Sequence, residues 1–357
     1  MKTRPSNILK CQLTAWTWIL ALSIVHPGSS LAQSKINWLF KNHRDGYPMF
    51  RIPTMLSLPN GKILAFCEGR QSLMDHGNID LVMKSSSDSG KTWSKLQVVW
   101  DQQNHTCGNP VPVFEAQTQT LFLIATLDND SVFVLSSTDF GNSWNQPRNI
   151  TAMVKPTNWE WYATGPVHGI QLHHSNWAGR LVVPCNHTVR GSPIHQSHAI
   201  FSDDHGKTWF RSENVPDQKT DECTLAECSN GELYLNMRNS NRSLPNRKFS
   251  YSSDGGMHWT KCSYDSVLVE PVCQGSVLSL TDHQMVFSNP NHRSKRKNLT
   301  LSFSRDNGQT WYKRIPVFHG KSAYSDLIQL NHSQLLICFE TGKFLPYGGI
   351  VFTTISY

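Results

Sequence analysis

The chain has 357 residues, of which 38% are hydrophobic and 17% charged, and its formal net charge is +7. No Pro/Ser-rich linker and no change in composition divides it, so the length indicates one large domain rather than two. No lysine-rich tract is present, which argues against nucleic acid as a partner. The mild positive balance favours at most an anionic substrate.

The first 32 residues have the composition of an export signal. Basic residues at Lys2, Arg4 and Lys10 precede an apolar stretch from about residue 13 to 25, and small residues follow up to Ala32. This order is typical of a signal peptide, whereas an uncleaved membrane anchor would need roughly 20 apolar residues. We expect a signal peptide at 1–32, one domain at 33–357 and no integral membrane association. The predicted location is extracellular or periplasmic, or lysosomal if the source is eukaryotic.

A short motif, Ser-x-Asp-x-Gly-x-(Thr/Ser/His)-Trp, occurs five times along the chain. Its copies are Ser86–Trp93, Ser137–Trp144, Ser202–Trp209, Ser252–Trp259 and Ser304–Trp311. The central aspartates are 51, 65, 50 and 52 residues apart. A period of this size indicates a repeat architecture built from supersecondary units.

Each copy of this Asp box has the residues of a tight hairpin turn. The aspartate carboxylate can accept hydrogen bonds from the turn's own amides, and the glycine supplies a positive φ. Between the boxes lie short apolar runs, such as 62–67, 120–126, 180–183 and 232–235, that are typical of strands. The pattern predicts an all-β propeller in which four-stranded units stack radially. The Asp-box aspartates are therefore predicted to be structural rather than catalytic.

Cysteine and histidine patterns give no metal signature. Removal of 1–32 leaves eight cysteines, which permits disulfides in an exported chain without fixing their connectivity. No CxxC or HExxH motif is present, so neither a metal nor a cofactor is expected.

The segments between the Asp boxes resemble the sialidase (exo-α-neuraminidase) family. The chain carries Met-Phe-Arg-Ile-Pro at 49–53, then Glu68-Gly69-Arg70 and, five residues after that arginine, Asp75. Further matching segments are 221–223 (DEC), 236–238 (NMR), 287–290 (FSNP), 296–301 (RKNLTL), 323–327 (AYSDL) and 338–340 (CFE). The resemblance covers essentially the whole chain after residue 32 and implies a six-bladed β-propeller.

The resemblance implies that three arginines, Arg51, Arg238 and Arg296, clamp the carboxylate of sialic acid. Guanidinium suits this role because its planar fork pairs bidentately with a carboxylate and keeps its charge. Glu340 is expected to hold Arg51 and to offset part of the repulsion within the triad. Arg70 is expected to contact the substrate's oxygen substituents.

The resemblance also implies a catalytic set of Tyr324, Glu222 and Asp75. An anionic nucleophile would be repelled by the carboxylate next to the anomeric carbon, and sialidases use a tyrosine instead of the usual carboxylate. A neutral phenol needs a base, and Glu222 is expected to supply it. Asp75 is the expected general acid and, later, the base for water.

Each of these residues also has a purely structural interpretation. Tyr324 could pack within a strand, where Ala323 stands in place of the glycine usual in the family, and Asp75 could cap a turn. The aromatic segment 158–162 (NWEWY) could stack on a sugar, although packing is favoured. We interpreted this segment as a loop.

The expected activity is retaining hydrolysis of terminal sialic acid from glycoproteins, gangliosides and sialyl-oligosaccharides through a tyrosyl-enzyme intermediate. Two alternatives stay open. Transfer of the sialic acid would need much the same residues, and a non-catalytic Asp-box propeller would bind a glycan without cleaving it.

Overall fold

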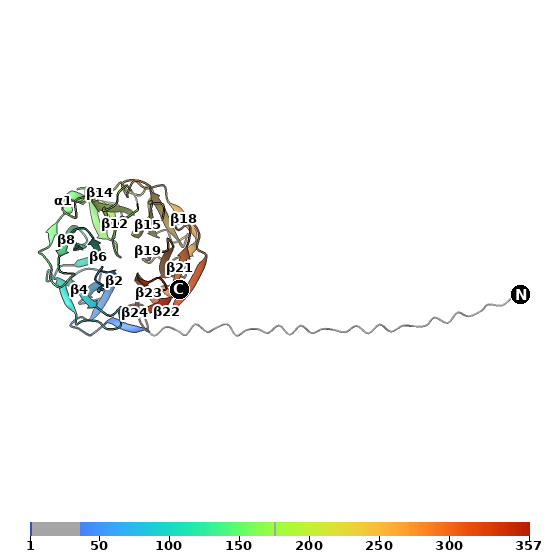
Figure 1. The fold of residues 1–357 in the computed structure, drawn as a ribbon, viewed down its shortest axis with the longest axis horizontal. Coiled ribbons are helices and arrows are strands. Elements are labelled where there is room, and N and C mark those ends of the chain that lie inside the picture. Colours follow the sequence, from blue (N-terminus) through green and yellow to red (C-terminus); the bar gives the residue numbers. More distant parts are fainter. Residues whose placement is uncertain (2–35, 175) are drawn as a thin grey trace. The chain divides into compact units, whose positions relative to one another are not determined.

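The computed structural model describes Met1, residues 36–174 and residues 176–357, so the predicted signal peptide lies outside the described residues. Strands dominate the described chain, and its single α-helix, α1, covers Thr151–Val154. Figure 1 shows the sheets arranged radially around a central axis. No helix among the described residues is long and apolar enough to cross a membrane.

Consecutive strands pair into antiparallel sheets, as expected for hairpins joined by short turns. Three of the sheets have four strands each: β2 (Met49–Ser57), β3 (Ile63–Arg70), β4 (Ile79–Ser86) and β5 (Gln97–Trp100); β6 (Cys107–Glu115), β7 (Thr120–Leu127), β8 (Ser131–Ser137) and β9 (Arg148–Asn149); β15 (Thr220–Glu227), β16 (Leu233–Asn239), β17 (Asn246–Ser252) and β18 (Ser263–Val269). A further sheet contains β10 (Trp159–Thr164), β12 (Leu181–Val189), β13 (His195–Ser202) and β14 (Phe210–Arg211), with β11 (Ile170–Gln171) paired to β12.

The remaining sheet has seven strands in the order β1 (Asn37–Lys41), β24 (Gly349–Ser356), β23 (Gln334–Thr341), β22 (Lys313–Asn331), β21 (Lys297–Ser304), β20 (Met285–Pro290) and β19 (Ser276–Ser279). The 19-residue strand β22 pairs with β21 along its first half, up to Lys321, and with β23 from Ser322 onward. Because β1 pairs with β24, the two ends of the described chain meet in one sheet.

Apolar side chains fill the space between neighbouring sheets. One cluster packs Val113 and Ile124 of the β6–β9 sheet against Leu181 and Ile200 of the β10–β14 sheet. Another joins the two halves of the seven-stranded sheet through Leu301 and Ile337. The all-β prediction and the propeller-like arrangement are confirmed, and the number of blades stays a prediction.

The Asp boxes form the predicted turns. In the third copy, Asp204 Oδ1 accepts a hydrogen bond from the Thr208 amide at 2.8 Å, and Ser202 Oγ accepts one from the Gly206 amide at 2.9 Å. Gly206 has a φ of +79°, which a side chain would rarely tolerate. The other four copies repeat this contact between the aspartate and the amide four residues later.

These turns also fasten each sheet to its neighbour, which the sequence did not predict. A Cβ added to Gly206 would lie 2.4 Å from the Phe122 ring of the preceding sheet. Three other Asp-box glycines meet the second strand of the preceding repeat in the same way, through Leu336 for Gly90, Leu64 for Gly141 and Tyr234 for Gly308. A Cβ on Gly256 would lie 3.6 Å from Val182 of the preceding sheet, which is an ordinary contact distance. The first repeat therefore packs on the last, and the ring closes.

A buried carboxylate ties the innermost strands together at the axis. Asp326 is fully buried, and its oxygens accept hydrogen bonds from Thr54 Oγ1 at 2.9 Å, Ser276 Oγ at 2.7 Å and His168 Nδ1 at 2.9 Å. These partners come from three separate innermost segments. A buried carboxylate satisfied in this way fixes where the segments meet.

All eight cysteines among the described residues are free, and seven of them are buried. The predicted possibility of disulfides is therefore not realised in this structure. Burial raises the pKa of Cys185 to about 12, so its thiol behaves as a small apolar group.

Candidate active site

The predicted catalytic residues meet in one cavity of about 790 Å³ at the start of the innermost strands. Arg51 is the third residue of β2, Glu222 is the third residue of β15, and Tyr324 is the third residue of the second half of β22. The strand pairing shifts register at all three places, as in a β-bulge. Bulges are common beside active sites because they re-aim side chains, and here they accompany side chains that line the cavity.

Glu340 holds Arg51 as expected. Its Oε1 accepts a hydrogen bond from Arg51 Nε at 2.7 Å and another from the Ile52 amide at 2.9 Å. The Glu340 side chain is fully buried and that of Arg51 is 8% exposed. The guanidinium is therefore anchored at Nε. It lies 4.3 Å from the Tyr347 ring centroid.

Tyr324, Glu222 and Arg238 form a tight polar cluster on the cavity floor. The Tyr324 hydroxyl donates to Glu222 Oε1, and Arg238 Nη1 lies 2.6 Å from Glu222 Oε2 and 3.1 Å from the Tyr324 oxygen. Tyr324 is 5% exposed. Burial raises the pKa of Tyr324 well above its ordinary value of 10.0, and the charge of Glu222 raises it further against the opposing charges of Arg238 and Arg296.

Arg296 completes the ring of cations around the phenol. Its Nη1 donates to the Tyr347 hydroxyl at 2.9 Å and its Nη2 to the Val272 carbonyl at 2.9 Å. The guanidinium carbons of Arg51 and Arg296 lie 5.4 and 5.5 Å from the Tyr324 ring centroid. The three arginines predicted as a clamp therefore surround the predicted nucleophile.

Asp75 occupies the rim, with 80% of its side chain exposed. Its Oδ1 accepts a hydrogen bond from Arg70 at 2.6 Å and lies 3.9 Å from Arg51. Partial desolvation raises the pKa of Asp75, but the hydrogen bond and charge of Arg70, with the charges of Arg51 and Arg296, outweigh it and lower the pKa below 3.8. In this state Asp75 is a carboxylate.

Arg70 lines the cavity, and its contacts are to protein groups. Besides Asp75, it donates from Nε to Glu68 Oε2 at 2.8 Å. Glu68 Oε1 in turn accepts from the Asn109 amide at 2.8 Å. Glu68 and Asn109 were not assigned a role from the sequence, although Glu68 stands two residues before Arg70.

Tyr347 was missed as well. It lines the cavity and contacts both Arg51 and Arg296. A tyrosine seven residues after Glu340, in a Gly- and Pro-containing segment, carries no distinctive pattern. Only the fold brings it between two arginines.

The aromatic segment 158–162 forms part of β10 and is not the loop we expected. Trp159 packs face to face on His187 with ring centroids 3.3 Å apart, and Tyr162 is fully buried. Trp161 points differently and lines the cavity beside His195, at a centroid distance of 4.9 Å. The pairing of β10 with β12 shifts register between Trp159 and Tyr162, so regular alternation is broken there and the strand supplies side chains to both the core and the cavity.

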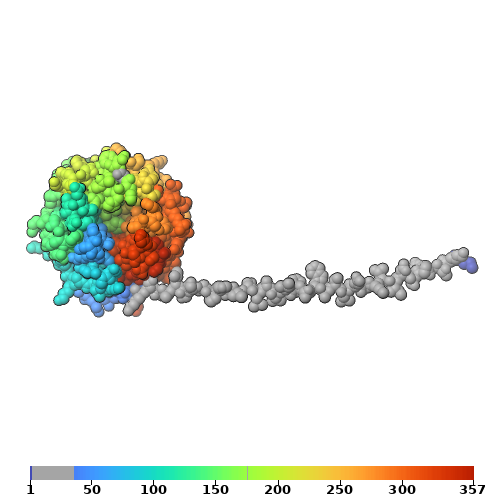
Figure 2. All heavy atoms as spheres, in the orientation of Figure 1, coloured from blue at the N-terminus to red at the C-terminus, as the bar shows by residue number. Residues whose placement is uncertain are grey.

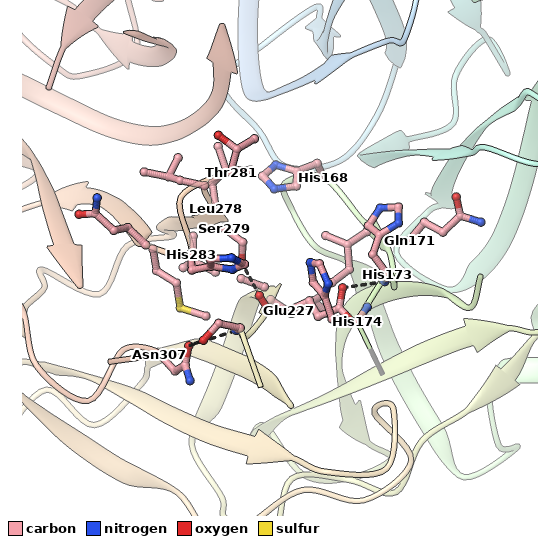
Figure 3. A pocket seen from close by; sticks show the side chains of 18 of the residues that line it. His168, Gln171, His173, His174, Glu227, Leu278, Ser279, Thr281, His283 and Asn307 are labelled. Carbon is pink, nitrogen blue, oxygen red and sulfur yellow. Dashed lines mark hydrogen bonds between the residues drawn. The ribbon is translucent and has the colours of Figure 1, made fainter. Parts of the chain in front are cut away.

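A second cavity of about 370 Å³ lies at the other ends of the innermost strands, where β2, β15 and β19 finish (Figure 3). It is lined by four histidines together with apolar and neutral polar side chains, and none of the described residues that line it is an arginine or a lysine. Glu227, the one carboxylate among these described residues, already accepts from the His173 and His174 amides at 2.7 and 2.8 Å. The residues predicted from the sequence line the first cavity and not this one.

The fold is a propeller with Asp-box turns, and its cavity is lined by arginines. Together these features indicate a carbohydrate-active class of protein. Residues 61–337 match the family described as the BNR repeat-like domain. The chain is 30% identical over 339 residues to a sialidase of Micromonospora viridifaciens, a match that covers 86% of this chain and 52% of that protein. It is 28% identical to mouse sialidase-3, with 89% of this chain and 93% of that protein covered.

Among solved structures, the Hadza microbial sialidase Hz136 superimposes with a TM-score of 0.82 at 25% identity, covering 90% of this chain and 68% of that one. The intramolecular trans-sialidase from Ruminococcus gnavus shares the fold, with a TM-score of 0.74 at 16% identity over 90% of this chain and 97% of that one. The chain belongs to the sialidase family, a family of glycoside hydrolases. It spans about half the length of the Micromonospora protein.

Proposed function

We propose that the protein is an exo-α-sialidase that removes terminal sialic acid with net retention of configuration. The observation that carries the proposal is the cluster of Tyr324, Glu222 and Arg238, in which a buried phenol donates to a carboxylate and lies among three guanidiniums. Glycans that end in sialic acid, on glycoproteins, gangliosides or free oligosaccharides, are the proposed substrates.

The clamp would bind the sugar carboxylate through Arg51, Arg238 and Arg296. Arg51 has only its Nε engaged by Glu340, so the outer nitrogens of its guanidinium are available to a ligand. Charge-assisted hydrogen bonds of this kind contribute about 1.5 to 3 kcal/mol each. The bound carboxylate also offsets the mutual repulsion of the three cations.

In the first step, the Tyr324 oxygen forms a bond to the anomeric carbon while Glu222 takes the phenolic proton. The bond from that carbon to the leaving oxygen breaks, and Asp75 donates the proton that the leaving oxygen needs. Since burial raises the pKa of Tyr324, the phenol depends on Glu222 for this transfer. Arg238 stabilises the developing phenolate from 3.1 Å.

In the second step, water attacks the anomeric carbon while Asp75 removes a proton from that water. The bond from the anomeric carbon to the Tyr324 oxygen breaks, and the departing phenolate takes its proton back from Glu222. Asp75 must carry a proton at the start, although the surrounding arginines lower its pKa in the empty site. Binding of an anion to Arg51 and Arg296 removes part of that effect and raises the pKa toward the working range. Substrate binding therefore favours the protonated form of Asp75, which the first step needs.

The test of the mechanism compares the parent protein with Tyr324→Phe on a fluorogenic aryl α-sialoside, with the product anomer followed by NMR. We expect initial release of α-sialic acid by the parent and loss of at least about 100-fold in kcat in the variant. An initial β-anomer would contradict retention. Full activity of Tyr324→Phe would remove the tyrosine from the nucleophile role.

Transfer is the second candidate, because a solved structure described as an intramolecular trans-sialidase shares this fold. The fold therefore does not separate hydrolysis from transfer. Product analysis with and without an added oligosaccharide acceptor distinguishes them. A non-catalytic glycan-binding propeller is disfavoured, since binding alone needs neither Asp75 nor the pair of Tyr324 and Glu222.

We further propose that the propeller has six blades. The two halves of β22 would belong to different blades, since one pairs with β21 and the other with β23. The apolar cluster between these halves supports the division, because it resembles those between separate sheets. We propose that residues 33–357 form a single catalytic domain that follows a cleaved signal peptide at 1–32. The proposed location is outside the cytoplasm or in a lysosome.

A further inference from the structure

Three chain segments, 292–297, 319–321 and 341–347, come together beside the catalytic cavity. Lys297 pairs with Lys321 in the register of β21 and β22, and the Ser322 amide donates to the Arg296 carbonyl at 3.0 Å. Lys321 Nζ donates to the Phe344 carbonyl, and Thr341 Oγ1 donates to the Lys321 carbonyl at 2.7 Å. Because the first segment contains Arg296 and the third contains Tyr347, the three segments form part of the cavity rim.

This part of the rim is strongly cationic. It carries Arg293, Lys295, Lys297, Lys321 and Lys343, which we call the cationic rim. The three segments contain no acidic residue, and none of these five cations forms an ion pair among the described residues. Five cations without an ion-pair partner among the described residues are therefore gathered next to the site.

Two large apolar side chains protrude within the cationic rim. Phe344 is 77% exposed and Leu345 is 56% exposed, the first being the most exposed large hydrophobic side chain inside the described ring of sheets. Leu73 and Met74, at 50% and 54%, stand on the loop that carries Asp75. Asp75 and Tyr347 both lie next to Arg51, so the two loops border the same cavity.

Asp128 and Asp130, in the turn between β7 and β8, do not pair with the cationic rim. Asp128 Oδ2 lies 2.6 Å from His105 Nδ1, and Asp130 contacts Lys155. These two carboxylates are paired with other residues, whereas none of the five rim cations forms an ion pair among the described residues.

We propose that the cationic rim, with Phe344 and Leu345, docks on the surface of an anionic lipid bilayer, and that this docking brings the cavity to the glycolipids among the substrates proposed above. Lysine and arginine attract an anionic membrane surface, and exposed apolar side chains enter its interfacial layer. A soluble polyanionic glycan would use the cations but would leave Phe344 and Leu345 without a partner. The substrate in this proposal rests on the proposed sialidase function. The membrane-binding surface does not depend on it.

The direct test measures co-sedimentation of the purified protein with vesicles that contain no sialic acid. We expect binding to phosphatidylcholine vesicles with 30% phosphatidylserine and much less to phosphatidylcholine alone. The triple variant Arg293→Gln/Lys295→Gln/Lys343→Gln should lose about 100-fold in partitioning, since each cation near such a surface contributes about fivefold. The variant Phe344→Ser/Leu345→Ser should lose about tenfold or more.

Matched controls remove the same chemistry elsewhere. Lys91→Gln/Lys207→Gln/Lys261→Gln removes three exposed cations in or beside Asp boxes, and Phe210→Ser removes a phenyl ring that is 52% exposed on β14. Both controls should bind vesicles like the parent. Absence of parent binding to anionic vesicles, or equal losses in the controls, would overturn the proposal.

Activity assays separate this proposal from the sialidase proposal. The rim variants should cleave soluble sialyllactose like the parent and cleave ganglioside in anionic vesicles more slowly, in proportion to lost binding. The triple variant could lose vesicle binding while Phe344→Ser/Leu345→Ser keeps it, and soluble polysialic acid could compete with the vesicles for the protein. In that case the rim is a polyanion site and the membrane proposal fails. If vesicles bind as expected but no sialoside is cleaved, the surface stands and the proposed function falls.

Discussion

The proposed role of Asp75 as general acid depends closely on its surroundings, because the acid must carry a proton while the neighbouring arginines lower its pKa. It is exposed at the rim and hydrogen-bonded to Arg70, whereas the proposed nucleophile Tyr324 is buried and its proposed base Glu222 is 12% exposed. Since a general acid contributes about 10²- to 10⁴-fold, Asp75→Ala should lose at least 100-fold in kcat/KM on sialyllactose. On an aryl sialoside, whose leaving group needs little protonation, the loss should stay below about tenfold. Parallel steady-state kinetics check this, and equal losses would exclude Asp75 as the acid.

Glu340 gives a second prediction at the residue scale. Replacing one partner of a buried ion pair costs about 3–5 kcal/mol, so Glu340→Gln should lower the free energy of unfolding, measured with urea. It should also raise KM, because Arg51 loses the anchor that orients it toward the substrate. The matched control is Glu270→Gln, which disrupts the buried pair of Glu270 and Arg247 at 2.7 Å outside the cavity. The control should lose stability with KM unchanged, and a similar rise in both variants would argue against a specific role for Glu340.

At the scale of elements, the Asp-box turn joins one sheet to the next through its glycine. In Gly206→Ala the new methyl group would overlap the Phe122 ring, at a site with φ of +79°. We expect a loss of about 2–4 kcal/mol in the free energy of unfolding from strain and overpacking combined. Gly61→Ala is the control, because its φ is +79° with nothing within 4 Å of the added Cβ. Equal losses in urea titrations would mean that backbone strain alone matters and that the contact between sheets does not.

At the scale of the whole molecule, buried histidines link stability to pH. Desolvation lowers the pKa of His187 to about 3, with the charges of Arg211 and His195 adding to the effect, and it lowers the pKa of His198 well below its ordinary value, with the charges of His187 and Arg211 adding. Below about pH 6.5 the unfolded chain binds protons at these two histidines. The folded chain does not bind these protons at the same pH, so acid favours unfolding. His187 contributes a slope of up to about 1.4 kcal/mol per pH unit between pH 6.5 and 3, and His198 adds a slope of the same sign below pH 6.5.

The measurement is the free energy of unfolding from pH 8 to pH 4 for the parent and for His187→Asn/His198→Asn. The double variant should be less stable at pH 8, where a packed pair is lost, and should show a flatter pH dependence below 6.5. Other groups, such as Asp80 with its pKa raised to about 6 by burial, act alike in both proteins and cancel in the comparison. Parallel curves for the two proteins would show that this histidine pair does not limit acid stability.

Much of the fold and of the site was accessible from the sequence because the signals are local. An Asp box closes its hydrogen bonds within eight residues, so its turn can be predicted from the motif alone. The candidate side chains Arg51 and Glu222 stand in short motifs at the starts of strands, and Tyr324 stands in another motif just after β22 changes its pairing partner from β21 to β23.

What the sequence by itself determined is the repeat, the all-β class, the family resemblance and the candidate residues, because each rests on neighbours along the chain. Only the tertiary structure decided that Tyr347 lies between two arginines, that Glu68 holds Arg70, and that the segment with Trp161 is a strand rather than a loop. It also decided that the cations of three separate segments gather at one rim. The contacts of Tyr347, the contact of Glu68 with Asn109 and the gathering of the rim cations join residues that are distant in sequence, and closing the ring of sheets is the physical event that brings them together.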